Sequence, residues 1–142
     1  MARGDAGDAI RVGEDMIIAG IGCRKGASQA EVEAAMDDAL AQAKRARDAL
    51  ALIATSDGKA GEPGIVAAAR ARGVPLVRVA PSDLEAAGSR AQSSSPRVKA
   101  LVGVPSVAEA AALAAGGPNA KLILPRISVG PVTCALAETE AP

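Results

Sequence analysis

The side chains best suited to chemistry lie in two short polar loops. The first loop contains Gly22, Cys23, Arg24, Lys25 and Gly26. A thiol beside two cations at the start of a helix can have a lowered pKa, which makes Cys23 a candidate nucleophile; the alternative is a small residue that fills a turn. The glycines allow the backbone to approach a ligand, and free N–H groups at a helix start attract an anion. The pattern predicts an anion-binding loop; the alternative is a tight turn whose charged side chains face water.

The second loop contains Lys59 and Glu62, three residues apart and directly before Pro63. Such a pair could hold a substrate or transfer a proton, so both residues join Cys23 as catalytic candidates; a surface ion pair is the alternative. The first loop matches neither nucleotide motif, because Lys25 stands where the dinucleotide fingerprint needs its third glycine, and residues 25–28 lack the Gly-Lys-Ser order of a P-loop. A phosphate- or nucleotide-binding protein is therefore disfavoured.

Composition excludes several other classes of function. The 142 residues include no His, Phe, Tyr or Trp. Histidine-dependent triads and histidine metal ligands are thus impossible, and the aromatic platforms that stack on nucleic-acid bases are missing. Residues 16–137 carry 14 basic and 10 acidic side chains, a balance of about +4 that suits a small anionic ligand better than a nucleic acid. With 35 Ala residues, the core must consist of closely packed backbones.

The two cysteines and the apolar segments bear on cofactors and location. Cys23 and Cys134 are far apart and show no metal-ligand spacing, and Cys134 is expected to be inert within a strand. No apolar stretch approaches the roughly 18 residues that a membrane span needs. The first residues do not resemble a signal peptide. We therefore expect a cytoplasmic protein with no metal, no cofactor and no contact with membranes.

Strands and helices, which must position these two loops, alternate along the chain. Residues 1–14 are polar and aperiodic and predict a flexible arm, and residues 15–138 predict one α/β domain. Strands are expected at 16–22, 50–55, 75–80, 120–125 and 128–137, with a mobile loop at 89–96 and an extended stretch at 98–104. This alternation predicts a three-layer domain with a mostly parallel, mixed sheet flanked by helices, in which the last two strands pair antiparallel at one edge.

Helix boundaries follow from capping signals. Three capping boxes are expected, at Ser28 with Glu31, Ser82 with Glu85, and Ser106 with Glu109. The first helix should continue to about residue 48, and the last should be Ala-rich to residue 115. Between them, Pro63 suits a first helical position and Gly73 a left-handed exit. Two of these helix starts directly follow the two polar loops.

Four blocks of sequence lie in a distinctive order. They are residues 20–26, Ala54-Thr55 with Lys59 and Glu62-Pro63-Gly64, residues 103–112, and Val132-Thr133 with Ala135. Together, over roughly residues 16–137, they resemble the family of CobE and the C-terminal domain of CbiG in cobalamin biosynthesis. One departure is visible, since the resemblance leads us to expect Lys where this chain has Arg126. A permanently charged guanidinium cannot replace an amine that acts as a nucleophile or an acid.

The resemblance implies a role in building the corrin ring. The leading hypothesis is a CobE-type protein that binds, and could transform, a precorrin or hydrogenobyrinic-type intermediate, which is an anionic tetrapyrrole. The resemblance adds Thr133 to the ligand-binding residues of the two loops. If the protein is an enzyme, full-length CbiG implies a hydrolase that opens a precorrin lactone and releases acetaldehyde. The alternative is a non-catalytic docking or carrier protein for neighbouring pathway enzymes.

Overall fold

The computed structural model describes residues 15–88 and 107–140. The expected arm at 1–14, the expected loop at 89–96 and the extended stretch at 98–104 lie outside the described residues. The strands are β2 (Asp15–Cys23), β3 (Leu50–Ser56), β4 (Leu76–Val79), β5 (Lys121–Val129) and β6 (Val132–Glu140). The helices are α1 (Gln29–Gln42), α2 (Pro63–Arg72), α3 (Pro81–Gly88) and α5 (Val107–Gly116), with 3₁₀ turns at Arg47–Ala49 and Asp57–Lys59. None of these helices has the length and apolar composition of a membrane span.

The strands form one mixed sheet in the order β4-β3-β2-β6-β5. β2 pairs in parallel with β3, and β3 with β4, whereas β6 is antiparallel to both of its neighbours. β6 alone therefore runs against the direction of the other described strands. This arrangement confirms the predicted mixed sheet with an antiparallel hairpin at one edge. It also brings the loops after β2 and β3 side by side.

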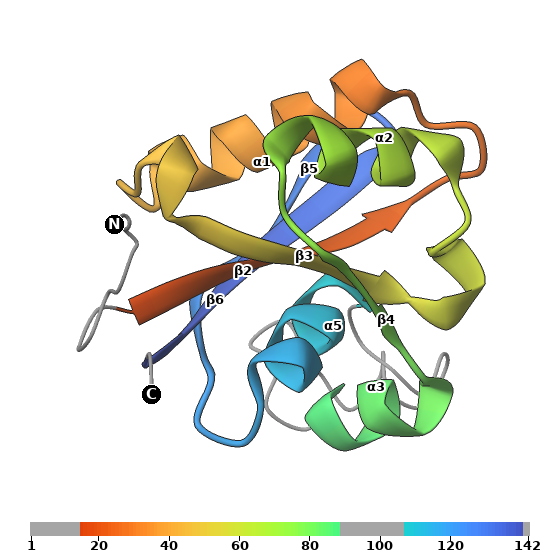
Figure 1. Ribbon diagram of the computed structural model, residues 1–142. Helices are drawn as coiled ribbons and strands as arrows, with labels where there is room; N and C mark the ends of the chain where they lie inside the picture. Colours follow the sequence, from red (N-terminus) through yellow and green to blue (C-terminus); the bar gives the residue numbers. More distant parts are fainter. Residues whose placement is uncertain (1–14, 89–106, 141–142) are drawn as a thin grey trace.

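Helices cover both faces of the sheet, which gives the predicted three layers (Figure 1). α1 and α2 enclose one core with the β2 side chains of Ile17, Ala19 and Ile21, and α3 and α5 enclose another around Ile18. Backbones approach closely, as the Ala-rich composition predicts. A Cβ on Gly20 would lie 1.9 Å from the carbonyl oxygen of Ala108, so only glycine lets α5 pack this closely on β2.

The capping signals have different outcomes. Ser28 and Glu31 form the complete capping box of α1, with Ser28 Oγ accepting from Glu31 N–H at 3.1 Å. The box expected at Ser82 is wrong, because α3 begins at Pro81 and Ser82 lies inside it. Proline has no N–H to donate, which suits it to the first position of a helix. Ser106 lies outside the described residues.

The first helix ends at Gln42, not near residue 48 as expected. Lys44 adopts a left-handed conformation with φ of 59°, and Arg45 N–H donates to Leu40 C=O at 2.9 Å. These are the features of a Schellman motif, which usually has glycine at the left-handed position. A lysine there gives no sequence signal for the end of the helix. By contrast, Pro63 and Gly73 bracket α2 as predicted.

Candidate functional site

The two polar loops meet at the carboxyl end of the parallel strands. Cys23 is the last residue of β2, and the loop after β3 leads through Lys59 to Glu62, the N-cap residue of α2. Gly26 N–H donates to Glu62 Oε1 at 3.0 Å. The parallel pairing of β2 with β3 therefore joins loops that are 36 residues apart in sequence. We call this region, with Cys23, Arg24, Lys25, Lys59 and Glu62, the carboxyl-end site.

Cys23 is partly buried and lies close enough to Lys59 and Glu62 to be affected by both charges. Burial raises the pKa of the Cys23 thiol above its ordinary value; Lys59 opposes this effect and Glu62 adds to it. The expected lowering of this pKa is therefore wrong. The thiol packs against the core beneath α1 and α2, whereas Arg24 and Lys25 are exposed. Cys134 is fully buried, and burial raises its pKa to about 12.

The N–H groups of the first loop mostly have acceptors within the chain. Arg24 N–H donates to Pro131 C=O at 3.0 Å and Ala27 N–H to Arg24 C=O at 3.2 Å. Ser28 N–H donates to Glu31 Oε1 at 2.9 Å. Together with the bond from Gly26 to Glu62, these contacts occupy four backbone donors of the predicted anion-binding loop. Side chains must therefore supply most of the positive charge for a ligand.

Arg24, Lys25 and Lys59 are available for that purpose. Within the described part of the chain, none of the three forms an ion pair. Lys59 is half-buried beside the Cys23 thiol, so its charge acts in a less solvated setting than those of the other two. A cation that is partly desolvated and unpaired favours contact with an anionic group.

Gly22 and Thr133 form a separate contact on the other face of the sheet. They are partners in the β2–β6 ladder, and Thr133 Oγ donates to Gly22 C=O at 3.2 Å. Successive residues of a strand point to opposite faces, so Gly22 and Cys23 do not share a face. A Cβ on Gly22 would lie 2.7 Å from Thr133 Oγ. The structure thus places the Thr133 side chain on the face of the sheet opposite to that of Cys23.

Glu109 is a buried polar residue whose position the sequence did not reveal. Its carboxylate is inaccessible to solvent and accepts from Arg126 N–H at 2.9 Å. This bond ties α5 to β5 where the β5–β6 register shifts between Leu124 and Ile127. A single Glu within an Ala-rich run is the available signal for a buried carboxylate; the capping box expected at Ser106 with Glu109 includes a residue outside the described ones. Arg126 itself contributes its backbone here, and its side chain is exposed.

The described side chains provide no place for a metal. Across residues 15–88 and 107–140, no three Cys, Asp or Glu side chains gather in a group that could hold an ion. The carboxyl-end site instead places cations near a partly buried thiol and a carboxylate.

Comparison with solved structures shows the class of protein to which this fold belongs. The fold, a mixed sheet between two helical layers, is shared with solved cobalamin biosynthesis proteins. A CobE crystal structure matches with a TM-score of 0.79 and 34% identity, over 88% of this chain and 94% of that chain. The protein named chiG from Agrobacterium tumefaciens matches with a TM-score of 0.69 and 39% identity, over 86% and 97% of the two chains.

Sequence comparison then gives the family. Residues 17–137 match the family described as Cobalamin synthesis G C-terminus, and the chain belongs to this family. It is also 40% identical to Protein CobE from a Sinorhizobium species over 121 residues, which are 85% of this chain and 79% of that protein. The predicted resemblance is confirmed, and these relatives support a role in cobalamin biosynthesis.

Proposed function

We propose that this chain binds an anionic tetrapyrrole intermediate of cobalamin biosynthesis, of the precorrin or hydrogenobyrinic type, at the carboxyl-end site. Family membership supports the pathway. The observation that carries the proposed location is the set of three cations, Arg24, Lys25 and Lys59, that form no ion pair within the described residues. They lie on two loops joined by the bond from Gly26 to Glu62.

The chemistry of such a ligand fits these cations. Tetrapyrrole intermediates carry many carboxylates, and a hydrogen bond between charged groups contributes roughly 1.5–3 kcal/mol. Arg24 and Lys25 are exposed and can adjust to different carboxylates, whereas Lys59 is half-buried and more fixed. Several weak contacts of this kind would give an affinity that falls with added salt, because screening acts on exposed charges.

Binding without a covalent step at Cys23 is favoured over nucleophilic catalysis. A raised pKa keeps the thiol protonated near neutral pH, and the thiolate is the reactive form. The Glu62 carboxylate accepts a hydrogen bond from Gly26 N–H and so connects the two loops. We therefore assign Cys23 and Glu62 to the walls of the site, and Arg24, Lys25 and Lys59 to ligand contact.

Titration with hydrogenobyrinic acid tests this proposal. The protein has no aromatic residues, so the visible and near-ultraviolet spectrum of the ligand can be followed directly. We expect a saturable spectral change that becomes weaker with added salt. Replacing Arg24 and Lys25 together with Ala should weaken binding about tenfold or more, which corresponds to the loss of one charge-assisted bond.

A control variant with the same change in net charge distinguishes a local effect at the site from the effect of the overall charge of the protein. Arg70→Ala combined with Lys121→Ala also removes two exposed cations, but from α2 and β5 near the opposite end of the sheet. This variant should bind within about twofold of the unchanged protein if the site is local. Absence of binding to the intact chain would contradict the ligand, and equal losses in both double variants would contradict the location. A new absorbing product would instead indicate turnover.

A further inference from the structure

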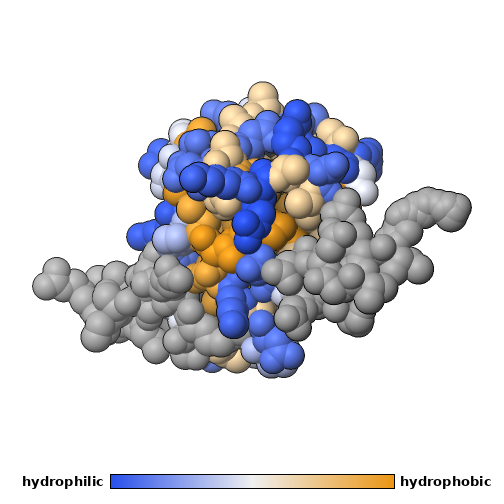
Figure 2. Space-filling model, turned by 90° about the vertical axis from the view of Figure 1, so that its left-hand side faces the viewer, coloured by the Kyte–Doolittle hydropathy of each residue, from blue (hydrophilic) through white to orange (hydrophobic). Residues whose placement is uncertain are grey.

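A groove of about 490 Å³ lies at the opposite end of the sheet. It is lined by Arg47, Asp48, Leu50, Ala71, Arg72, Gly73 and Val74, where α2 leads into β4 and the 3₁₀ turn Arg47–Ala49 leads into β3. Figure 2 faces this end of the molecule and shows hydrophobic residues gathered below the hydrophilic α1–α2 layer. Leu50 is buried and Val74 half-buried, so the groove has an apolar floor beside two arginines.

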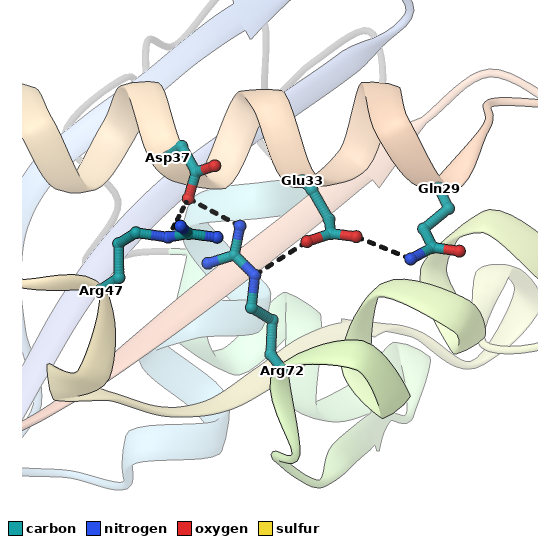
Figure 3. Close-up of polar contacts among 5 residues, drawn as sticks. All are labelled: Gln29, Glu33, Asp37, Arg47 and Arg72. Atoms are coloured by element: carbon teal, nitrogen blue, oxygen red, sulfur yellow. Dashed lines mark hydrogen bonds and ion pairs between the residues drawn. The ribbon is translucent and has the colours of Figure 1, made fainter.

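The two arginines belong to a network that joins α1 to α2 (Figure 3). Arg72, the last residue of α2, places Nε 3.0 Å from Glu33 Oε1, and its Nη2 lies 2.6 Å from Asp37 Oδ1. Arg47 Nε lies 3.1 Å from the same Asp37 oxygen. Glu33 also accepts from Gln29 Nε2 at 2.7 Å. The two guanidinium groups are therefore held close together by one shared carboxylate oxygen.

One buried nitrogen of this network has no acceptor among the described residues. The Arg72 side chain is only 9% exposed, and its Nη1 is a buried nitrogen without a hydrogen-bond acceptor among the described residues. A buried N–H group without an acceptor is unfavourable, and native structures usually satisfy it with protein, water or ligand. The Arg47 side chain pairs with Asp37 but is 68% exposed, and such a pair is weak enough for Arg47 to rotate outward and admit an acceptor to Nη1.

We propose that this groove binds an aliphatic carboxylate, with its oxygens accepting from Arg72 Nη1 and Arg47 and its methylene groups packed on Leu50 and Val74. Guanidinium groups donate only, so the missing partner must be an acceptor, and their planar donor set matches a carboxylate. The charges of Glu33 and Asp37 already balance the two arginines, and Asp48 also lines the groove. A monoanion with an apolar part therefore fits better than a phosphate dianion.

A methyl-resolved NMR titration with sodium propionate tests the groove in the full chain. The methyl signals of Leu50 and Val74 should shift and saturate, whereas sodium chloride at equal ionic strength should not produce this effect. The methyl signals of Ile21 and Val132, which lie in the core near the carboxyl end of β2, should stay unchanged and serve as internal references. Failure of Leu50 and Val74 to show a saturable shift would overturn the proposal.

A pair of matched variants makes the test specific. Arg47→Gln should weaken propionate binding at least fivefold, and because this side chain is mostly exposed, the fold should be retained. Arg45→Gln removes a neighbouring arginine that pairs with Glu138 at 3.0 Å outside the groove, and it should leave the affinity unchanged. Equal affinity in Arg47→Gln and the unchanged protein would overturn the assignment.

The carboxylate could come from a free small acid or from a side chain of the tetrapyrrole. Adding hydrogenobyrinic acid to the same sample distinguishes the two sources. Shifts at Leu50 and Val74 that propionate prevents would support the groove with a tetrapyrrole as its source, and would contradict the carboxyl-end location proposed above. Shifts that propionate causes and hydrogenobyrinic acid does not would support a groove that binds a free small acid. The proposed function would then be tested by the spectral titration described above.

Discussion

Both the amino end and the carboxyl end of the parallel strands carry arginine side chains, but the amino end holds them in a network. There, Arg45 pairs with Glu138 at 3.0 Å, and Arg72 pairs with Glu33 and Asp37 at 3.0 and 2.6 Å. The Arg72 side chain is largely buried, so solvent screens its two ion pairs less than it screens pairs between exposed side chains. Hydrogen bonds with Asp37 and Glu33 raise the pKa of Arg72 even though burial lowers it.

The carboxyl end holds its charges more loosely. Arg78 pairs with Asp57 at 3.1 Å, but both side chains are mostly exposed. Arg24, Lys25 and Lys59 form no ion pair with the described residues. The loops here are connected mainly through backbone groups and close contacts instead. The difference indicates that paired cations stabilise the fold at the amino end, whereas three cations of the carboxyl end have no acidic partner among the described residues.

Removing Arg72 should have the largest effect on stability. Arg72→Ala leaves Glu33 and Asp37 without their main partner, and we expect the free energy of unfolding to fall by roughly 2–3 kcal/mol, at the low end for breaking a buried pair because both carboxylates are partly exposed. Urea unfolding followed by far-ultraviolet circular dichroism measures this loss. Arg70→Ala, on the same helix but exposed, should change stability by less than about 0.5 kcal/mol. Equal losses of stability in Arg72→Ala and Arg70→Ala would contradict the view that the network stabilises the fold more than an exposed arginine does.

A methyl group at the carboxyl end should have the next largest effect. A Cβ on Gly64 would lie 2.2 Å from the carbonyl oxygen of Ala27, so Gly64→Ala must push α2 away from the first loop. Overpacking of this kind costs roughly 1–3 kcal/mol, measured by the same urea unfolding. Gly58→Ala is the matched control, because its Cβ would have no atom within 4 Å. If Gly64→Ala were as stable as this control, close backbone contact would not hold the two loops together.

The contrast between the ends was only partly predictable from the sequence. Short-range signals succeeded, because the capping box at Ser28 and the Pro63–Gly73 bracket depend on neighbouring residues. The meeting of the two loops depends on the parallel pairing of β2 with β3, and the sequence does not give the strand order. The Arg72 network had no local signal, since Arg72 is 39 residues from Glu33. Two acidic residues four apart on α1 would repel each other and so could have indicated a cation from elsewhere.

The protonation of the candidate site was harder to foresee. The sequence places Cys23 beside two cations, which favours a thiolate, but the fold turns the thiol toward the core while Arg24 and Lys25 point to solvent. Burial of a side chain depends on tertiary packing, and it raises the pKa of a thiol. The position of β6 between β2 and β5 likewise depends on long-range pairing that no local pattern encodes.

The amino-end network should also make the free energy of unfolding depend on pH. Hydrogen bonds from Gln29 and Arg72 lower the pKa of Glu33 below its ordinary value of 4.5. Its contribution is therefore complete above the unfolded pKa and is lost as the pH falls through the folded pKa. We expect a loss of about 0.5 kcal/mol, the scale of a partly exposed ion pair, that Glu33→Gln does not show. Urea unfolding of both proteins at pH 5.5 and pH 3 would measure it, and parallel losses would contradict it.

The smallest effect tests whether the carboxyl-end charges act on one another. Glu62 raises the pKa of Cys23 and Lys59 lowers it. Because the thiolate is the reactive form, Glu62→Gln should speed alkylation of Cys23 about twofold near neutral pH, and Lys59→Gln should slow it about twofold. Peptide mapping after brief alkylation gives both rates. Cys134, fully buried with its pKa raised to about 12, should react far more slowly in every variant and reports any loosening of the fold. If the two substitutions changed the Cys23 rate in the same direction, access rather than charge would control this thiol, and the cations at this end would not be acting on it.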